Sequence, residues 1–351
     1  MNLYLTRSGR LRRQDNTLSF EVFSPSDSPD YDLSNDFSSD ELENEPVQNK
    51  NALPVENIDA VYVFSEMSLN SKLLNFLAQN KIPLHVFNYY GHHAGSFLPH
   101  AEQLSGILVI KQAEAFQNPE KRLLISKKIL AASAHNIHAV MQYYARKNPK
   151  IIPFVQEVSA FQNELSECID QDALMGYEGS IRRIYYQAWH LWLAAADKNF
   201  KRVYRPADNP LNATVSFVNA LLYTACVSEL YRTALYPGIS YIHQPQSRRY
   251  SLALDLVEPF KPLLADRMVF RLWNSNMISD RDFLPASNGF ILTDDARRMI
   301  VSEWDNELKH TIFLDSLKRS VSYRQLLRLD CYKLVNFLLE DREYQPYRTR
   351  I

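Results

Sequence analysis

The chain has 351 residues, a net charge of −1 and 46% hydrophobic residues, which is enough to bury the core of one large domain or two smaller ones. Its 8 glycines are few for this length, which argues against an architecture of many strands and turns and favours helix. The three cysteines show no CxxC spacing, and we see no apolar run close to the roughly 20 residues that a membrane span needs. We therefore expect a cytoplasmic protein with no membrane segment and no thiolate zinc site.

The first hundred residues read as a small β domain. Apolar and polar residues alternate over 2–23, with turn residues between them, which predicts a β-meander. Residues 24–52 carry eight acids and one lysine, so they hold a charge of −7 and leave +6 on the rest of the chain. This composition is typical of a mobile acidic insertion, either merely solvated or a partner-binding arm that competes with DNA. A strand at 58–64, a helix from 69 and a strand at 83–90 follow, so the domain is expected to span 1–98.

From about residue 100 the apolar residues recur with the helical period of 3.6. Asn118 and Pro119 stand where a helix cap and a first-turn proline belong, and predict a helix that runs to about 147. Further helices are expected at 102–115, 153–169, 171–197, 211–235, 250–274, 293–318 and 321–341. The prediction is an α+β protein of two domains, in which an all-helical catalytic domain spans 99–351.

The stretch from Tyr241 to Pro262 is the most informative in the chain. It contains His243, Asp255 and Glu258, and the two acids are three residues apart among leucines and a valine. If 251–258 is helical, both carboxylates lie on one face. Two like charges in apolar surroundings are costly unless a proton or a cation compensates them, and a divalent metal would do so.

A second segment places Glu178 between Gly176 and Gly179, in a chain that uses glycine sparingly. Small neighbours would let a ligand approach the acid closely. Alternatively, both glycines serve tight helix packing and Glu178 only pairs with Arg182, one turn further along a helix.

Taken together, the four residues Glu178, His243, Asp255 and Glu258 offer carboxylate oxygens and one imidazole. Such a set suits Mg²⁺ or Mn²⁺ better than structural zinc, and either ion can polarise a phosphoryl oxygen. Basic residues close by in sequence could neutralise DNA phosphates; they are Arg182, Arg183, Arg248, Arg249 and Lys261. The combination suggests phosphoryl transfer on nucleic acid. Loss of one metal ligand should abolish activity, keep the fold and relieve repulsion between the acids.

The motifs resemble those of the CRISPR-associated integrase family, in its type I-like branch, over almost the whole chain. The opening Leu3-Tyr-Leu and the later Ile82-Pro-Leu-His-Val-Phe-Asn are similar to strands of its N-terminal domain. Met175-Gly-Tyr-Glu178-Gly resembles the segment that bears its first metal ligand. The longest matches are Tyr236-Pro-Gly-Ile-Ser-Tyr-Ile-His243 and Arg249-Tyr-Ser-Leu-Ala-Leu-Asp255-Leu-Val-Glu258-Pro-Phe-Lys-Pro262. The acidic insertion departs from the family pattern, outside these motifs.

The resemblance implies that Glu178, His243 and Glu258 hold a Mg²⁺ or Mn²⁺ ion and that Asp255 is a further acid of the active site. It implies an integrase that joins 3′-hydroxyl ends of short duplex DNA into a CRISPR repeat. It also implies a homodimer formed through the β domains, and a small partner protein. Two other activities stay open from the sequence: a metal-dependent nuclease acting mainly on branched DNA, and a DNA-binding scaffold without catalysis.

Overall fold

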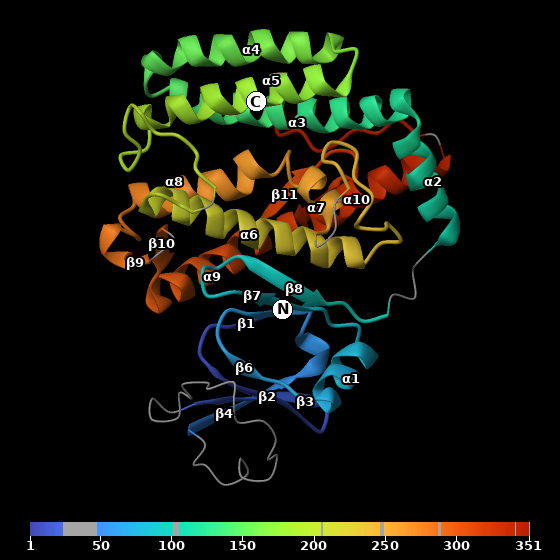
Figure 1. Ribbon diagram of the computed structural model, residues 1–351, viewed down its shortest axis with the longest axis vertical. Helices are drawn as coiled ribbons and strands as arrows, with labels where there is room; N and C mark the ends of the chain where they lie inside the picture. Colours follow the sequence, from blue (N-terminus) through green and yellow to red (C-terminus); the bar gives the residue numbers. More distant parts are fainter. Residues whose placement is uncertain are drawn as a thin grey trace. The chain divides into compact units, whose positions relative to one another are not determined.

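The computed structural model describes residues 1–23, 48–100, 105–204, 206–245, 249–286, 289–340 and 342–350, without the side chains of 48–52 and 166. The chain divides into two compact units, Met1–Ala101 and Glu102–Ile351. A strand-rich first region followed by a mostly helical one confirms the predicted α+β class (Figure 1). Residues 24–47 of the predicted acidic insertion lie outside the described residues, and its last part is not loop, because a strand begins at Gln48.

The first unit contains two four-stranded sheets. One has the order β1 (Asn2–Leu5), β5 (Ala60–Val63), β7 (Leu84–Phe87), β8 (His93–Phe97), and only its β7–β8 pair is antiparallel. The other has the order β4 (Gln48–Pro54), β3 (Thr17–Val22), β2 (Gly9–Gln14), β6 (Met67–Ser68). The predicted meander is therefore wrong in one respect: β2 and β3 form a hairpin, whereas β1 pairs with β5 in the other sheet.

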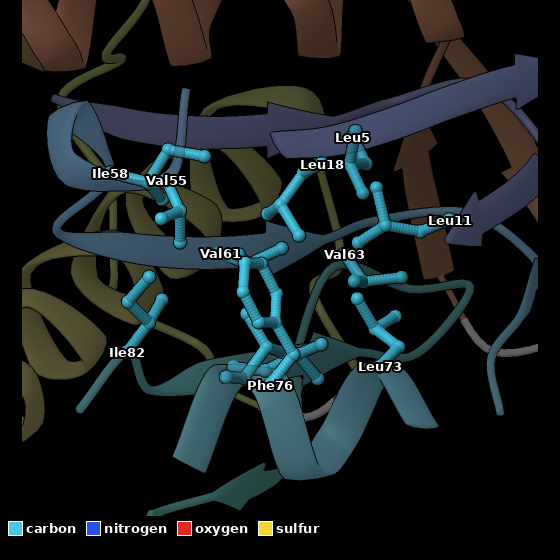
Figure 2. Packing of buried hydrophobic residues seen from close by; sticks show 12 residues of the cluster. Leu5, Leu11, Leu18, Val55, Ile58, Val61, Val63, Leu73, Phe76 and Ile82 are labelled. Carbon is cyan, nitrogen blue, oxygen red and sulfur yellow. The ribbon is translucent and has the colours of Figure 1, made fainter. Parts of the chain in front are cut away.

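The core of this unit follows from the strand pattern. Alternate residues of β1, β2, β3 and β5 turn apolar side chains inward, where they meet helix α1 (Ser71–Gln79) and the turn Val55–Asn57. Figure 2 shows Leu11 and Val63 beside Leu73 of α1, and Val61 beside Phe76 of the same helix. Asn70 caps α1 by accepting a hydrogen bond from the backbone N–H of Leu73 at 2.9 Å.

The second unit is built around long helices. They are α2 (Gly106–Gln117), α3 (Pro119–Ala145), α4 (Ile152–Glu167), α5 (Gln171–Ala188), α6 (Pro210–Tyr231), α7 (Ser251–Leu256), α8 (Arg267–Asn274), α9 (Asp294–Lys309) and α10 (Tyr323–Glu340), with a π-helix at Lys261–Asp266 and short 3₁₀ turns at Pro149–Ile151, Trp189–Leu191 and Asp280–Asp282. Helices α3, α4 and α5 lie side by side (Figure 1). As predicted, α3 begins at Pro119, and the side chain of Asn118 caps it.

Helix α6 is long and apolar enough to cross a membrane by length and composition, contrary to our reading of the sequence. However, 78% of its apolar window is buried inside the unit. Packing against α7, α8 and α10 supplies the apolar surroundings that its side chains need, so α6 acts as a core helix.

The expectation of an all-helical second domain is wrong. In the part of the unit that the structure describes, strands β9 (Phe283–Ala286) and β10 (Gly289–Leu292) form one hairpin, and β11 (Thr311–Leu314) and β12 (Arg319–Ser322) form another. The second hairpin interrupts the predicted helix 293–318, because Thr311-Ile-Phe-Leu is a run of β-branched and aromatic residues that favours strand. Lys318, with a φ of 50°, makes the turn between them.

Candidate active site

Helix α5 carries Glu178 and Arg182 on one face. Asp170 starts this helix by accepting a hydrogen bond from the N–H of Ala173 at 2.7 Å. Nε of Arg182 donates to Oε1 of Glu178 at 3.2 Å. A Cβ atom added at Gly176 or Gly179 would meet no atom within 4 Å, so close helix packing does not require either glycine. The two glycines leave space beside Glu178, whose side chain is 24% exposed.

Glu258 is buried between two cations. It lies just beyond the end of α7, with 4% of its surface exposed. Nη2 of Arg182 donates to its Oε2, and Nζ of Lys261 donates to its Oε1 at 2.5 Å. Burial alone would raise the pKa of Glu258, but Lys261 and Arg182 together lower this pKa to about 2. Arg182 therefore links Glu178, on its own helix, to Glu258, which lies 76 residues further along the sequence than Arg182.

Asp255 organises the loop that carries His243. Its side chain is fully buried. Oδ2 accepts from the N–H groups of Tyr241 at 2.6 Å and Ile242 at 2.9 Å, and Oδ1 accepts from the N–H of His243 at 3.1 Å. The same Oδ1 lies 2.7 Å from Nδ1 of the His243 ring. Since an ionised carboxylate only accepts hydrogen bonds, Nδ1 carries the proton and Nε2 keeps its lone pair for a ligand.

Two further helices hold the carbonyl groups of this loop. Nε of Arg122, from α3, donates to the carbonyl oxygen of Tyr241 at 2.9 Å. Nε2 of Gln171, at the start of α5, donates to the same oxygen at 3.2 Å. Ser240 Oγ donates to the carbonyl oxygen of His243 at 2.7 Å. The backbone around His243 is therefore fixed from three elements, which orients its imidazole before any ligand arrives.

The four residues that we expected to act together form one connected network. Arg182 joins Glu178 to Glu258, Asp255 holds His243, and the backbone N–H of Glu258 donates to the carbonyl oxygen of Asp255 at 3.2 Å. Asp255 and Glu258 do not face a common ion, because one turns to the loop and the other to Arg182. Among the described residues, no group of three or more histidine, cysteine, aspartate or glutamate side chains is clustered closely enough to hold a metal.

The donor set nevertheless fits a hard divalent cation. Two carboxylates and one imidazole nitrogen are ligands that Mg²⁺ and Mn²⁺ accept. The imidazole is already oriented by a carboxylate, an arrangement common behind metal-bound histidines. In the structure the positive charge between Glu178 and Glu258 is supplied by Arg182.

The predicted DNA-contacting residues fall into different places. Arg182 is buried inside the network, with 8% of its surface exposed, and Lys261 pairs with Glu258. Arg183 and Arg249 are exposed. Arg248 lies outside the described residues.

Asp266 is the acid that the sequence analysis missed. It ends the π-helix, is 1% exposed, and has a pKa raised to about 6, because burial outweighs the opposing charges of Arg182 and Lys261. Its place in the apolar run Lys261-Pro-Leu-Leu-Ala-Asp266 was the available signal, since a lone acid in such a run needs a partner. A cavity of about 780 Å³ between β11, α10 and the segment 343–350 is lined by none of Glu178, His243, Asp255, Glu258 and Asp266.

A strand-rich unit followed by a mostly helical unit is the architecture that we expected of the CRISPR-associated integrase family. The chain belongs to the Cas1 family, since the family described as CRISPR associated protein Cas1 matches residues 3–306. This confirms the resemblance noted in the sequence.

Relatives match along nearly the whole length. The chain is 40% identical over 349 residues to CRISPR-associated endonuclease Cas1 2 of Moorella thermoacetica, covering 99% of this chain and 98% of that one. It is 37% identical over 347 residues to CRISPR-associated endonuclease Cas1 of Fusobacterium nucleatum, covering 99% and 96%. The structure of a CAS1 protein from Thermotoga maritima superposes with a TM-score of 0.81 at 31% identity, with both chains fully covered. A casposase bound to integration product, at 19% identity and a TM-score of 0.79 over all of this chain and 96% of that one, shares the fold.

Proposed function

We propose that this protein is the DNA endonuclease and integrase of CRISPR adaptation, acting in the cytoplasm. The reaction is a transesterification: the 3′-hydroxyl of a short incoming duplex attacks a phosphodiester at a repeat boundary. One phosphorus–oxygen bond forms, another breaks, and the attacking hydroxyl loses its proton while the leaving 3′-oxygen gains one. The observation that carries the proposal is the connected network of Glu178, Arg182, Glu258, His243 and Asp255, in a chain of the Cas1 family.

Glu178, His243 and Glu258 would hold a Mg²⁺ or Mn²⁺ ion, which when bound would stabilise the charge that develops on the phosphoryl oxygens. The chain's own residues contribute positioning. Asp255 fixes the loop and the proton on Nδ1 of His243, which would leave Nε2 to bind the ion. Lys261 stays beside Glu258, where its charge offsets that of a phosphate group.

The exposed arginines Arg183 and Arg249 would contact backbone phosphates of double-stranded DNA, both of the protospacer and of the repeat. Arg248 would make contacts of the same kind. Such contacts give salt-dependent binding with little base readout. The protein would work as a homodimer joined through its strand-rich units, together with a small partner protein of the adaptation complex.

A strand-transfer assay tests the proposal. Labelled short duplex DNA with 3′-hydroxyl ends is incubated with a supercoiled plasmid that carries a CRISPR array, in Mg²⁺ or Mn²⁺, with the partner protein supplied. Wild type and the control His310→Ala, which changes an exposed histidine, should join label to plasmid, whereas His243→Ala should not. Nicking without joining would favour a nuclease that acts mainly on branched DNA. Binding without any product in either metal would favour a non-catalytic scaffold.

A further inference from the structure

Asn136 lies at the centre of a hydrogen-bond arrangement that the reaction described above does not use. It is on α3 and fully buried. Its Nδ2 donates to the carbonyl oxygen of Pro259 at 2.7 Å and to that of Tyr347 at 3.1 Å. Its Oδ1 accepts from the N–H of Thr349 at 2.8 Å. The two bonds to the segment 342–350 fix which way the amide points, so the NH₂ group is aimed at Pro259.

Pro259 directly follows Glu258, at a weak point of the backbone. Helix α7 ends at Leu256 and the π-helix begins at Lys261, so residues 257–260 are a junction between two kinds of helix. Pro259 has no N–H, so it cannot donate to the carbonyl of Asp255 as a helix residue would. A change of helix type leaves carbonyl groups in need of outside partners, and Asn136 supplies one of them.

The segment 342–350 supports the same junction directly. The ring of Tyr347 stacks on that of Phe260, with centroids 5.9 Å apart and planes 8° from parallel. Tyr344 is 1% exposed; burial raises the pKa of its hydroxyl well above the usual value, and the nearby Asp330 raises it further. His135 Nε2 lies 2.9 Å from the carbonyl oxygen of Thr349. The segment therefore packs against the junction that follows Glu258.

We propose that Asn136 is a positioning residue for Glu258, held in its orientation by Tyr347 and Thr349. It acts through the peptide that follows Glu258 and touches neither DNA nor metal. A buried amide with three hydrogen bonds stabilises the fold little more than a well-packed apolar side chain would. However, its hydrogen bonds hold the surrounding backbone in one conformation. The conformation around a metal ligand affects how tightly the ligand binds the metal. Loss of a residue that supports a ligand typically weakens metal binding about 10–100-fold. This inference rests on the proposed function, which assigns Glu258 to the metal.

The test compares Asn136→Leu with wild type and with Asn148→Leu. Leucine keeps the number and branching of the side-chain heavy atoms of asparagine and removes its hydrogen bonds. Asn148 is a matched control because it lies just beyond the C-terminal end of α3, where its Nδ2 also donates to a backbone carbonyl oxygen, that of Leu191, at 2.9 Å. The affinity for Mn²⁺ is measured on the whole protein by the loss of the free Mn²⁺ electron paramagnetic resonance signal, and strand transfer is followed over a range of Mn²⁺ concentrations.

We expect Asn136→Leu to bind Mn²⁺ about 10–100-fold more weakly than wild type. Strand transfer should fall at low Mn²⁺ and recover as Mn²⁺ is raised, with the affinity for DNA in EDTA unchanged. Asn148→Leu should bind Mn²⁺ as wild type does, even if it loses similar stability. If Asn136→Leu fails to fold, Tyr347→Leu, which removes the stack on Phe260 and keeps the bond to Pro259, should still weaken Mn²⁺ binding.

If a folded Asn136→Leu variant binds Mn²⁺ as tightly as wild type, the positioning role is overturned and the proposed function stands. If Asn136→Leu does not fold, the same result in Tyr347→Leu would overturn the positioning role. Absence of Mn²⁺ binding by wild type itself would overturn the metal assignment, and the role of Asn136 with it.

Discussion

Nδ1 of His243 lies 2.7 Å from Oδ1 of Asp255, and this contact makes the two residues one unit. The same carboxylate accepts three backbone N–H groups of the loop 241–243. Asp255 therefore sets both the backbone that carries the imidazole and the nitrogen that the imidazole presents. Asp255 is needed because it holds His243 in place. This role does not require Asp255 to contact a reacting atom.

Asp255→Asn should lose both stability and activity. An asparagine keeps one oxygen but places an NH₂ group against backbone donors, which we expect to cost about 1–3 kcal/mol. Strand transfer should fall about 10–100-fold, since the ring of His243 loses its acceptor. Urea unfolding and strand-transfer rates measure the two effects. Asp280→Asn, at an exposed acid, is the control, and a variant at 255 that integrates at the wild-type rate would contradict this role.

Glu258→Gln should destabilise the metal-free protein, contrary to the expectation that losing one acid relieves repulsion. The structure pairs Glu258 with Arg182 and Lys261, so its removal leaves buried positive charge uncompensated. The pKa of Glu258 is lowered from 4.5 to about 2, so its stabilisation is present above pH 4.5 and is lost as the pH falls towards 2. We expect a deficit of about 3 kcal/mol at pH 7. Urea unfolding at pH 7 and pH 3 checks this, and a constant difference between the two would argue against the ion pairs.

Asp266→Asn should stabilise the protein at high pH, whereas Glu258→Gln should destabilise it. The pKa of Asp266 is raised from 3.8 to about 6, so its contribution to stability is complete below pH 3.8 and is lost as the pH rises through 6. Asparagine does not titrate and avoids this loss. The variant should therefore gain up to about 3 kcal/mol over wild type at pH 8 and nothing below pH 4. Unfolding free energies at several pH values measure the gain, and a loss at pH 8 would show that Arg182 needs Asp266 as a counter-ion.

Arg182→Gln should reveal competition between the guanidinium and a metal. Arg182 occupies the place between Glu178 and Glu258 where a divalent ion would sit. Without it, the metal-free protein should melt at a lower temperature, because Glu178 and Glu258 lose the guanidinium between them, and Mn²⁺ should raise the melting temperature more than in wild type. Arg183→Gln, the exposed neighbour on α5, is the matched control. A smaller response to Mn²⁺ at 182 would mean that Arg182 orients the ligands instead.

The sequence could predict what depends on local pattern. The order of a strand-rich and a helical region, the start of α3 at Pro119 and the start of α5 near residue 171 follow from periodicity and capping. The motif match brought out Glu178, His243, Asp255 and Glu258. The predicted single helix 250–274 is wrong because Pro259 and Pro262 each remove a backbone donor, so α7 stops at Leu256 and a π-helix follows.

The rest depends on contacts between distant parts of the chain. The spacing of residues in the sequence does not show that Arg182 pairs with Glu258 or that Asp255 binds the backbone of residues 241–243. Both contacts form only when α5, the loop and α7 pack together. Asp266 and Asn136 were missed for the same reason. In the sequence Asp266 looks like a lone acid in an apolar run, and Asn136 looks like one of several polar residues beside His135 and His138.

The bond between Asn136 and Thr349 closes a loop of 213 residues. Contacts of such long sequence separation form late, because chain entropy opposes their closure until intervening helices have packed. Glu258 is thus oriented only once the helical unit has folded completely. A folding intermediate without the bond between Asn136 and Thr349 lacks this orientation. Recovery of Mn²⁺ binding during refolding would then lag behind recovery of helical circular dichroism, and it would mark the last stage of folding.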